Sequence, residues 1–273
     1  MSAPGQNQQL QEQDERIEKN LDAIKNRVVV FSGKGGVGKT TVAVNLAYAM
    51  IRQKKLTGLM DADITGPNVP QMVGVDAQPA ILDEHAIAPV QKDGLFVVSM
   101  ASLVPKDQPV IWRGPLRSGV IAQFLGDVMW GELDYLLADL PPGTGDEVLT
   151  AAQKMKPQMA IVVSTPQEVS LLDCRRAVNM AKKLNIPKIG VVENMAGLIC
   201  PHCSEVIDLF SKGGGEKLAK EMSVEYLGSI PMEVAVREGG DEGKPIILEN
   251  PEAASAQSII SIAQKITTIL ENE

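Results

Sequence analysis

The chain has 273 residues, 44% of them hydrophobic, and its 26 basic and 34 acidic side chains give a formal net charge of −8. This length and apolar content allow a sizeable buried core, and we expect a single α/β domain. The acidic balance disfavours nonspecific binding to nucleic acid or anionic lipid, so we expect no nucleic-acid partner and no membrane partner. No stretch approaches the roughly 20 apolar residues that span a bilayer, which predicts a cytoplasmic protein.

The first twenty residues are rich in Gln, Glu and Asn and contain almost no apolar side chains. Such a composition cannot offset the entropy lost on ordering. It predicts a mobile tail over residues 1–20, followed by a single domain over residues 21–273.

From residue 27 onward, short apolar runs alternate with helical patterns. The runs do not alternate strictly between apolar and polar residues, which is typical of parallel strands buried on both faces. The alternation of strands and helices predicts a doubly wound, mostly parallel sheet with helices on both faces and ligands at the carboxyl ends of the strands. The strand-like runs are residues 27–32, 56–63, 95–100, 133–140, 158–164, 188–194 and 224–230, and helical patterns run through Met50 and over 116–129, 169–184 and 251–273.

Two further segments are informative. Residues 78–94 lack helical periodicity and carry turn residues, which predicts a small hairpin. The last helical pattern begins near Pro251 and places Ile259, Ile262 and Ile266 on one face, so we expect an amphipathic helix.

The segment SGKGGVGKTT follows the first apolar run and precedes a helical pattern. It meets the pattern G-x-x-x-x-G-K-T, in which backbone N–H groups and the helix N-terminus hold phosphates. Lys39 is expected to reach the β- and γ-phosphates of a nucleotide, and the Thr40 hydroxyl to ligate Mg²⁺. A plain glycine turn is the alternative. The residues expected to hold the nucleotide are Gly33, Lys34, Gly35, Gly36, Val37, Gly38, Lys39, Thr40 and Thr41.

Acidic residues end two other predicted strands. Asp139 could hold a Mg²⁺-bound water, and the N–H group of Gly143 could meet the γ-phosphate. Of Asp61 and Asp63, one could orient the attacking water and the other support the metal shell, and we assign the catalytic role to Asp63. A turn or helix cap is the alternative for each carboxylate alone, but three acidic residues at strand ends, together with a phosphate loop, favour a joint site.

The loop contains a second lysine, Lys34, whose position in the loop is too distant for it to contact the phosphates that Lys39 binds. It could instead cross a dimer interface and contact the phosphates of the facing subunit, as an arginine finger does. An exposed loop lysine is the alternative.

The segment 198–205 contains Cys200 and Cys203, spaced so that two sulfurs can face one metal. Cys174 lies in a predicted helix and is expected to be a small buried hydrophobe. A closed four-thiolate site therefore requires two chains. The spacing does not separate an iron–sulfur cluster from Zn²⁺, and a redox dithiol is a third interpretation.

Together these motifs resemble a known family. GKGGVGKTT is similar to the deviant phosphate loop of the MinD/ParA/nitrogenase-iron-protein class of P-loop ATPases. The segments DADITGPNVP, ADLPPGTGD, VVENMAG and CPHC resemble Mrp/ApbC-type iron–sulfur cluster carrier ATPases, and the likeness covers residues 25–270. The resemblance implies that Lys34 works across an ATP-sandwich homodimer. It places Asp61 and Asp63 in one switch, Asp139 and Gly143 in a second, and Asn194 and Pro231 at the adenine.

The resemblance favours an ATPase that holds a labile [4Fe-4S] cluster between the Cys200 and Cys203 pairs of a homodimer and passes it to apo iron–sulfur proteins. A MinD/ParA-like positioning ATPase is one alternative, in which the C-terminal helix docks on membrane. That helix has one lysine, Lys265, whereas membrane-surface helices usually carry a basic face. A nickel or zinc metallochaperone NTPase is the other, but no aspartate accompanies Asn194 to read guanine.

Overall fold

The computed structural model describes residues 4–63, 66–100, 114–210 and 212–272. A nine-stranded sheet forms the centre of this part of the chain, in the order β10-β9-β8-β1-β7-β2-β6-β5, with β11 also paired to β9. All neighbours from β6 to β11 run parallel, and only β5 and β10 join antiparallel. The prediction of a mostly parallel sheet is confirmed.

The strands coincide with the apolar runs of the sequence, and the hairpin predicted within residues 78–94 is present as β3 and β4. The bounds are β1 Ile24–Phe31, β2 Thr57–Asp61, β3 Ala80–Asp83, β4 Ala86–Ala88, β5 Val90–Lys92, β6 Leu95–Ser99, β7 Leu133–Asp139, β8 Met159–Ser164, β9 Lys188–Ile199, β10 Val206–Ile207 and β11 Glu225–Met232. The sequence predicts β9 only as far as Asn194, and the structure extends it to Ile199.

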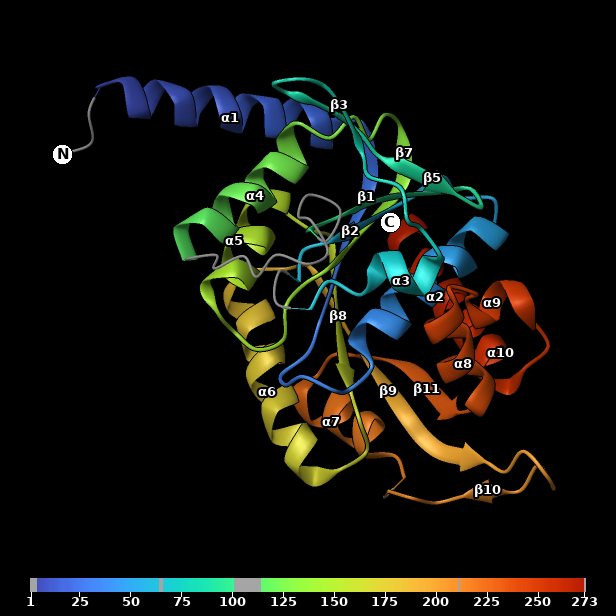
Figure 1. The fold of residues 1–273 in the computed structure, drawn as a ribbon. Coiled ribbons are helices and arrows are strands. Elements are labelled where there is room, and N and C mark those ends of the chain that lie inside the picture. The colour runs from blue at the N-terminus through green and yellow to red at the C-terminus, as the bar shows by residue number, and fades with distance from the viewer. Residues whose placement is uncertain (1–3, 64–65, 101–113, 211, 273) are drawn as a thin grey trace.

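Helices cover both faces of the sheet (Figure 1). One apolar cluster packs the first face against α1, α4, α5, α6 and α7, and a second packs the other face against α2, α3, α9 and α10. The helices are α1 Pro4–Asp22, α2 Lys39–Arg52, α3 Val69–Val73, α4 Gly114–Gly126, α5 Asp146–Met155, α6 Glu168–Lys183, α7 Gly214–Met222, α8 Val234–Glu242, α9 Ile246–Glu249 and α10 Ala254–Glu271. No described helix combines the length and the apolar character needed to cross a bilayer.

The N-terminal segment differs from the prediction of a mobile tail. Residues 4–22 form α1, a 19-residue helix, and Ile17 and Leu21 are buried in the first apolar cluster. Arg16 pairs with Asp127 over 3.0 Å, and the Asn20 amide donates to the backbone carbonyls of Leu125 and Val128, at the end of α4 and just after it. These two apolar side chains and the polar contacts fix the helix. The composition of residues 1–20 does not reveal this packing, because most of the helix is polar and only the end nearest β1 contacts the core.

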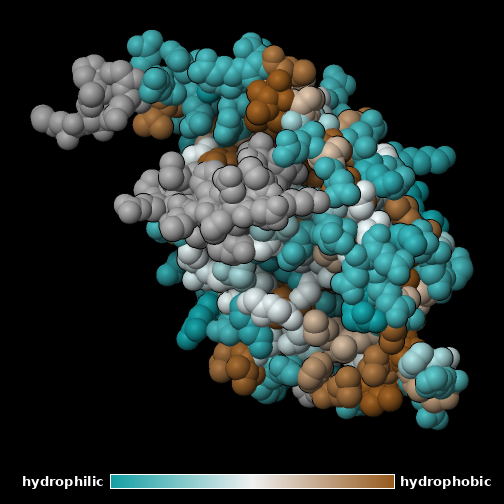
Figure 2. All heavy atoms as spheres, viewed as in Figure 1, coloured by the Kyte–Doolittle hydropathy of each residue, from teal (hydrophilic) through white to brown (hydrophobic). Residues whose placement is uncertain are grey.

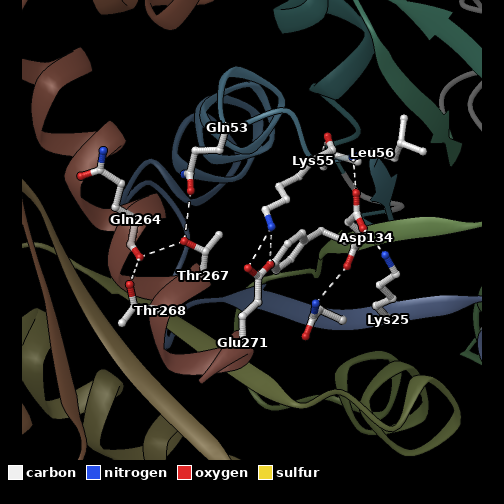
Figure 3. Close-up of polar contacts among 12 residues, drawn as sticks. Lys25, Gln53, Lys55, Leu56, Asp134, Gln264, Thr267, Thr268 and Glu271 are labelled. Carbon is white, nitrogen blue, oxygen red and sulfur yellow. Dashed lines mark hydrogen bonds and ion pairs between the residues drawn. The ribbon is translucent and has the colours of Figure 1, made fainter. Parts of the chain in front are cut away.

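The C-terminal helix α10 has the amphipathic face that the sequence predicts, with Ile259, Ile262 and Ile266 buried against the sheet. Its last turn contacts the end of the sheet where the parallel strands begin, away from the phosphate loop (Figure 3). Glu271 accepts a hydrogen bond of 2.7 Å from the Tyr135 hydroxyl and pairs with Lys55 over 2.8 Å. These contacts hold α10 to β7 and to the segment between α2 and β2.

Candidate nucleotide site and cysteine arm

The phosphate-loop residues 33–38 connect β1 to α2, the arrangement that the motif requires. Gly38 lies at the N-cap of α2 with φ 80°, a left-handed conformation that glycine adopts without strain. A Cβ there would also overlap the Asn194 amide, so the position tolerates only glycine. The loop is held on its other side, where Gly143 N–H donates to the Ser32 carbonyl over 2.8 Å.

Lys39 and Thr40, the first residues of α2, converge on Asp139 at the end of β7. The Lys39 ammonium lies 2.6 Å from Asp139 Oδ1, and the Thr40 hydroxyl donates to Asp139 Oδ2 over 2.7 Å. Asp139 is fully buried and Lys39 nearly so. The ammonium and the helix N-terminus can bind phosphate, and the hydroxyl and carboxylate oxygens are the kind of ligand that Mg²⁺ prefers.

The neighbouring strand β2 places Asp61 and Asp63 at the same edge, because β2 pairs with β7 so that Asp61 lies opposite Asp139. Asp63 Oδ2 lies 3.9 Å from the Lys39 ammonium. Asp61 is fully buried and accepts the Ser99 hydroxyl over 2.7 Å. Burial, together with the charge of Asp139, raises the pKa of Asp61 to about 7. Three carboxylates, those of Asp61, Asp63 and Asp139, therefore gather around the Lys39 ammonium at this end of the sheet.

A cavity of about 530 Å³ opens beside this cluster. It lies between the phosphate loop, the end of β11 and the helices α3 and α8, and it has the size of a small-molecule site. Asn194 and Pro231, both expected at the adenine, line it. Among the other expected residues, its walls contain Gly35, Gly36, Gly38, Lys39, Thr40, Thr41 and Asp63.

Asn194 contacts the phosphate loop directly. Its amide nitrogen donates to the Val37 carbonyl over 2.9 Å, and its side chain is buried. The preceding residue, Glu193, is also buried and accepts the Gly215 N–H at the start of α7. These two side chains fix the middle of β9 against the loop on one side and α7 on the other.

Lys34 is half-buried on the loop, close to α6. Its carbonyl accepts the Ser32 hydroxyl over 2.8 Å, whereas its ammonium forms no hydrogen bond or ion pair with the described residues.

Cys200 and Cys203 lie outside the cavity, on the turn that follows β9. All three cysteines are free, with Cys174 buried in α6 as the sequence predicts. Backbone N–H groups of His202 and Cys203 lower the pKa of the Cys200 thiol and so favour its thiolate. No group of three or more metal-binding side chains exists among the residues with described positions. One chain thus supplies a pair of thiols and not a closed site.

Several residues of the site were not predicted from the sequence. Ser99 ends β6 and binds Asp61, a position that resembles the acidic ends of β2 and β7 and could have been found on that ground. The buried Glu193 precedes Asn194 without any motif of its own. Met72 on α3 and Arg237 on α8 line the cavity, and no spacing in the sequence indicates them.

Comparison with known proteins places the chain in a family. A model of the ParA family, described as NUBPL iron-transfer P-loop NTPases, matches residues 23–267. An iron-sulfur cluster carrier protein of Methanocaldococcus jannaschii is 51% identical over 257 residues, which make up 93% of this chain and 88% of the relative. A protein with the same name from Pyrococcus horikoshii is 47% identical over 269 residues, with coverage of 94% and 91%.

Two solved structures share the fold. A nucleotide-binding protein in complex with ADP from Archaeoglobus fulgidus is 40% identical and has a TM-score of 0.77, covering 88% of this chain and 94% of its own. The cell division ATPase MinD of Pyrococcus furiosus is 26% identical with a TM-score of 0.67, covering 90% and 99%. The family model matches most of the chain, and the chain therefore belongs to the ParA/NUBPL iron-transfer family of P-loop NTPases.

Proposed function

We propose that this chain is a cytoplasmic ATPase that carries an iron–sulfur cluster. Two copies hold a labile [4Fe-4S] cluster between their Cys200 and Cys203 thiolates and pass it to apo iron–sulfur proteins. The names of the relatives from M. jannaschii and P. horikoshii support the carrier role. The three free cysteines fit a reducing compartment.

One strand carries the proposal. Asn194 in β9 is bonded to the phosphate loop, and the same strand continues to Ile199, directly before Cys200. A nucleotide that displaces the loop therefore acts on the strand that positions the thiols. Such a shared element allows nucleotide binding to change the affinity for the cluster.

The nucleotide half of the function rests on the cluster around Asp139. Lys39 would exchange its carboxylate partner for the β- and γ-phosphates of ATP, and the N–H groups of the loop would hold the remaining oxygens. Thr40 and Asp139 fit Mg²⁺ by their hard oxygen donors, and the ion would neutralise phosphate charge. Asp63 would orient the attacking water, and Lys34 of the facing copy would stabilise charge that develops on the phosphates.

The cargo half rests on the exposed turn. Cys203 is exposed and Cys200 half-buried, so a cluster bound there would meet solvent and incoming proteins. Few ligands and ready access suit delivery better than storage. Because one chain supplies two thiolates, four ligands require two chains.

The packing of α10 bears on the positioning alternative. A membrane-docking helix needs an apolar face free to enter the lipid. In α10 that face is occupied, since Ile259, Ile262 and Ile266 are buried against the sheet and α2. This burial favours the carrier over an ATPase that docks on membrane through its C-terminal helix.

The test is anaerobic reconstitution with iron and sulfide of the wild type and of a Cys200→Ala/Cys203→Ala variant. The expected result is a broad absorption band near 400 nm, about four irons per pair of wild-type chains, and neither in the variant. Transfer to an apo-ferredoxin would then be followed by the recipient's own spectrum. A wild type that stays colourless or binds only zinc would overturn the carrier function.

A further inference from the structure

Helices α3 and α8 come from two distant parts of the chain and meet beside the cavity. α3 follows β2, which ends at Asp61, and α8 follows β11, which contains Pro231. The two helices pack against each other (Figure 1), and both line the cavity. A contact between them therefore joins the segment expected to act at the γ-phosphate to the segment expected at the base.

The two helices meet through their last turns. Each ends at a glycine in the left-handed conformation, Gly74 with φ 68° and Gly243 with φ 71°. A Cβ on Gly243 would lie 2.5 Å from Gly74 Cα, so only bare backbone allows this approach. Beside it, the Gln71 side-chain amide donates to the Asp241 carbonyl over 2.6 Å. We call this contact, made by Gln71, Gly74, Asp241 and Gly243, the α3–α8 clasp.

Helix α8 has little buried surface of its own. None of its nine residues, all of which the structure describes, is buried, and Val236 packs only partly against the second apolar cluster. Figure 2 shows a largely hydrophilic surface over α3 and α8. The helix is attached at its ends, where Glu233 accepts the Ser255 N–H over 2.7 Å and the buried Ile246 follows. An element with so few buried contacts shifts easily, and the clasp passes such a shift to α3.

The start of α3 is held by the same carboxylate that holds Asp63. Asp61 Oδ2 accepts the Val69 N–H over 3.3 Å, and Asp61 Oδ1 accepts the Asp63 N–H over 3.2 Å. Asp63 Oδ2 in turn lies 3.9 Å from the ammonium of Lys39, the cation expected at the β- and γ-phosphates. A displacement of α3 therefore reaches the charged groups of the phosphate site through one buried side chain.

We propose that Gln71, Gly74 and Gly243 are positioning residues, which couple occupation of the base cavity to recognition of the γ-phosphate. A base that enters the cavity fixes α8, the clasp fixes α3, and Asp61 fixes Asp63 beside the phosphates. The inference rests on the nucleotide half of the proposed function and adds a route between the two ends of the nucleotide. Because such coupling is reciprocal, the γ-phosphate also strengthens the binding of the base.

The experiment compares Gly243→Ala with Gly131→Ala. Gly131 has φ 68° and precedes β7, and a Cβ there meets no atom of the described residues within 4 Å. The control therefore introduces the same backbone strain without a clash. Calorimetry with Mg²⁺ gives the dissociation constants for ADP and for the non-hydrolysable adenosine 5′-(β,γ-imido)triphosphate. The readout is the ratio of the ADP constant to the analogue constant, which measures what the γ-phosphate adds to affinity.

In Gly243→Ala this ratio should fall by roughly fivefold or more, and in Gly131→Ala it should equal that of the wild type. The ratio distinguishes a positioning role from a merely structural one, because a loosened domain loses both affinities together. A second pair of variants leaves the glycines in place. Gln71→Met removes the amide donor and should lower the ratio roughly threefold, whereas Gln71→Lys keeps a donor and should retain it.

The possible failures of this experiment are distinct. Tight binding of both nucleotides with an unchanged ratio in Gly243→Ala and Gln71→Met would overturn the inference and leave the proposed function intact. A wild-type ratio near unity would also overturn it, since the γ-phosphate would then add nothing to couple. A wild type that binds neither nucleotide would reject the nucleotide half of the proposed function, and the inference with it.

Discussion

The amide of Asn194 in β9 donates a hydrogen bond of 2.9 Å to the carbonyl of Val37 in the phosphate loop, and both residues are buried. The bond joins the loop that would hold the phosphates to the strand that ends beside Cys200. Asn194 also lines the cavity, so one side chain touches both the loop and the space for a base.

Removal of this amide should weaken nucleotide binding. Asn194→Ala leaves the Val37 carbonyl without its donor, and a lost buried hydrogen bond costs about 1–2 kcal/mol. We expect the dissociation constant for ATP to rise roughly tenfold, measured by calorimetry. Asn179→Ala is the control, because Asn179 is exposed on α6. Unchanged affinity in Asn194→Ala would show that the loop holds its shape without β9.

Lys39 should matter for stability as well as for binding. Its ammonium pairs with a fully buried carboxylate of Asp139 at 2.6 Å, and removal of one partner of a buried pair costs roughly 3–5 kcal/mol. Lys39→Ala should therefore abolish ATP binding and lower the urea midpoint. Lys39→Ala/Asp139→Asn should regain most of the stability and none of the binding. A double variant as unstable as the single one would contradict this account.

Substitution of Lys34, in contrast to that of Lys39, should leave both stability and ATP binding intact. Its ammonium has no partner among the described residues, so Lys34→Ala should change the free energy of unfolding by less than about 0.5 kcal/mol. Binding of ATP should persist and hydrolysis should be lost. Mixing this variant with Lys39→Ala should restore hydrolysis, since the second chain binds no nucleotide but supplies an intact Lys34. Activity in Lys34→Ala alone would reject the role across the dimer.

The fold and the phosphate loop could be predicted from the sequence because their signals are local. Buried parallel strands give continuous apolar runs, and the loop motif fixes what precedes and follows Gly38. The side chains that end strands, such as Asp61 and Asp139, could be grouped because parallel strands end at one edge.

What the sequence does not reveal depends on contacts between distant segments. α1 packs only through Ile17 and Leu21, and its polar composition conceals them. Arg237 lines the cavity only because the chain turns after β11 and packs α8 against α3. The extension of β9 to Ile199 follows from pairing with β10, since its own sequence around Gly197 does not predict a strand.

The pKa of Asp61 predicts a pH dependence for the nucleotide-free protein. The folded value is about 7 against an ordinary 3.8, so the folded chain binds more protons than the unfolded chain between these values. Stability from this group is therefore lost as the pH rises from about 4 to about 7. Asp61→Asn removes the titration, and its stability relative to wild type should increase between pH 5 and pH 8 by roughly 2–4 kcal/mol. Parallel pH profiles of the two unfolding midpoints would contradict the raised pKa.

The contacts of Glu271 with Tyr135 and Lys55 lie at the end of the sheet away from the phosphate loop. They should contribute to stability without affecting the nucleotide site. Glu271 accepts the hydroxyl of Tyr135, whose side chain is buried, while its pair with Lys55 is partly exposed and contributes less than about 1 kcal/mol. Glu271→Ala leaves the Tyr135 hydroxyl without its acceptor and should cost about 1–2 kcal/mol in urea unfolding. Glu271→Gln keeps an acceptor and should cost less, and Glu252→Ala, at an exposed position, is the control. Because Tyr135 lies near the start of β7 and Asp139 at its end, ATP affinity should be unchanged in all three variants. A loss of ATP affinity in Glu271→Ala would instead mean that α10 transmits strain through α2 to the phosphate loop.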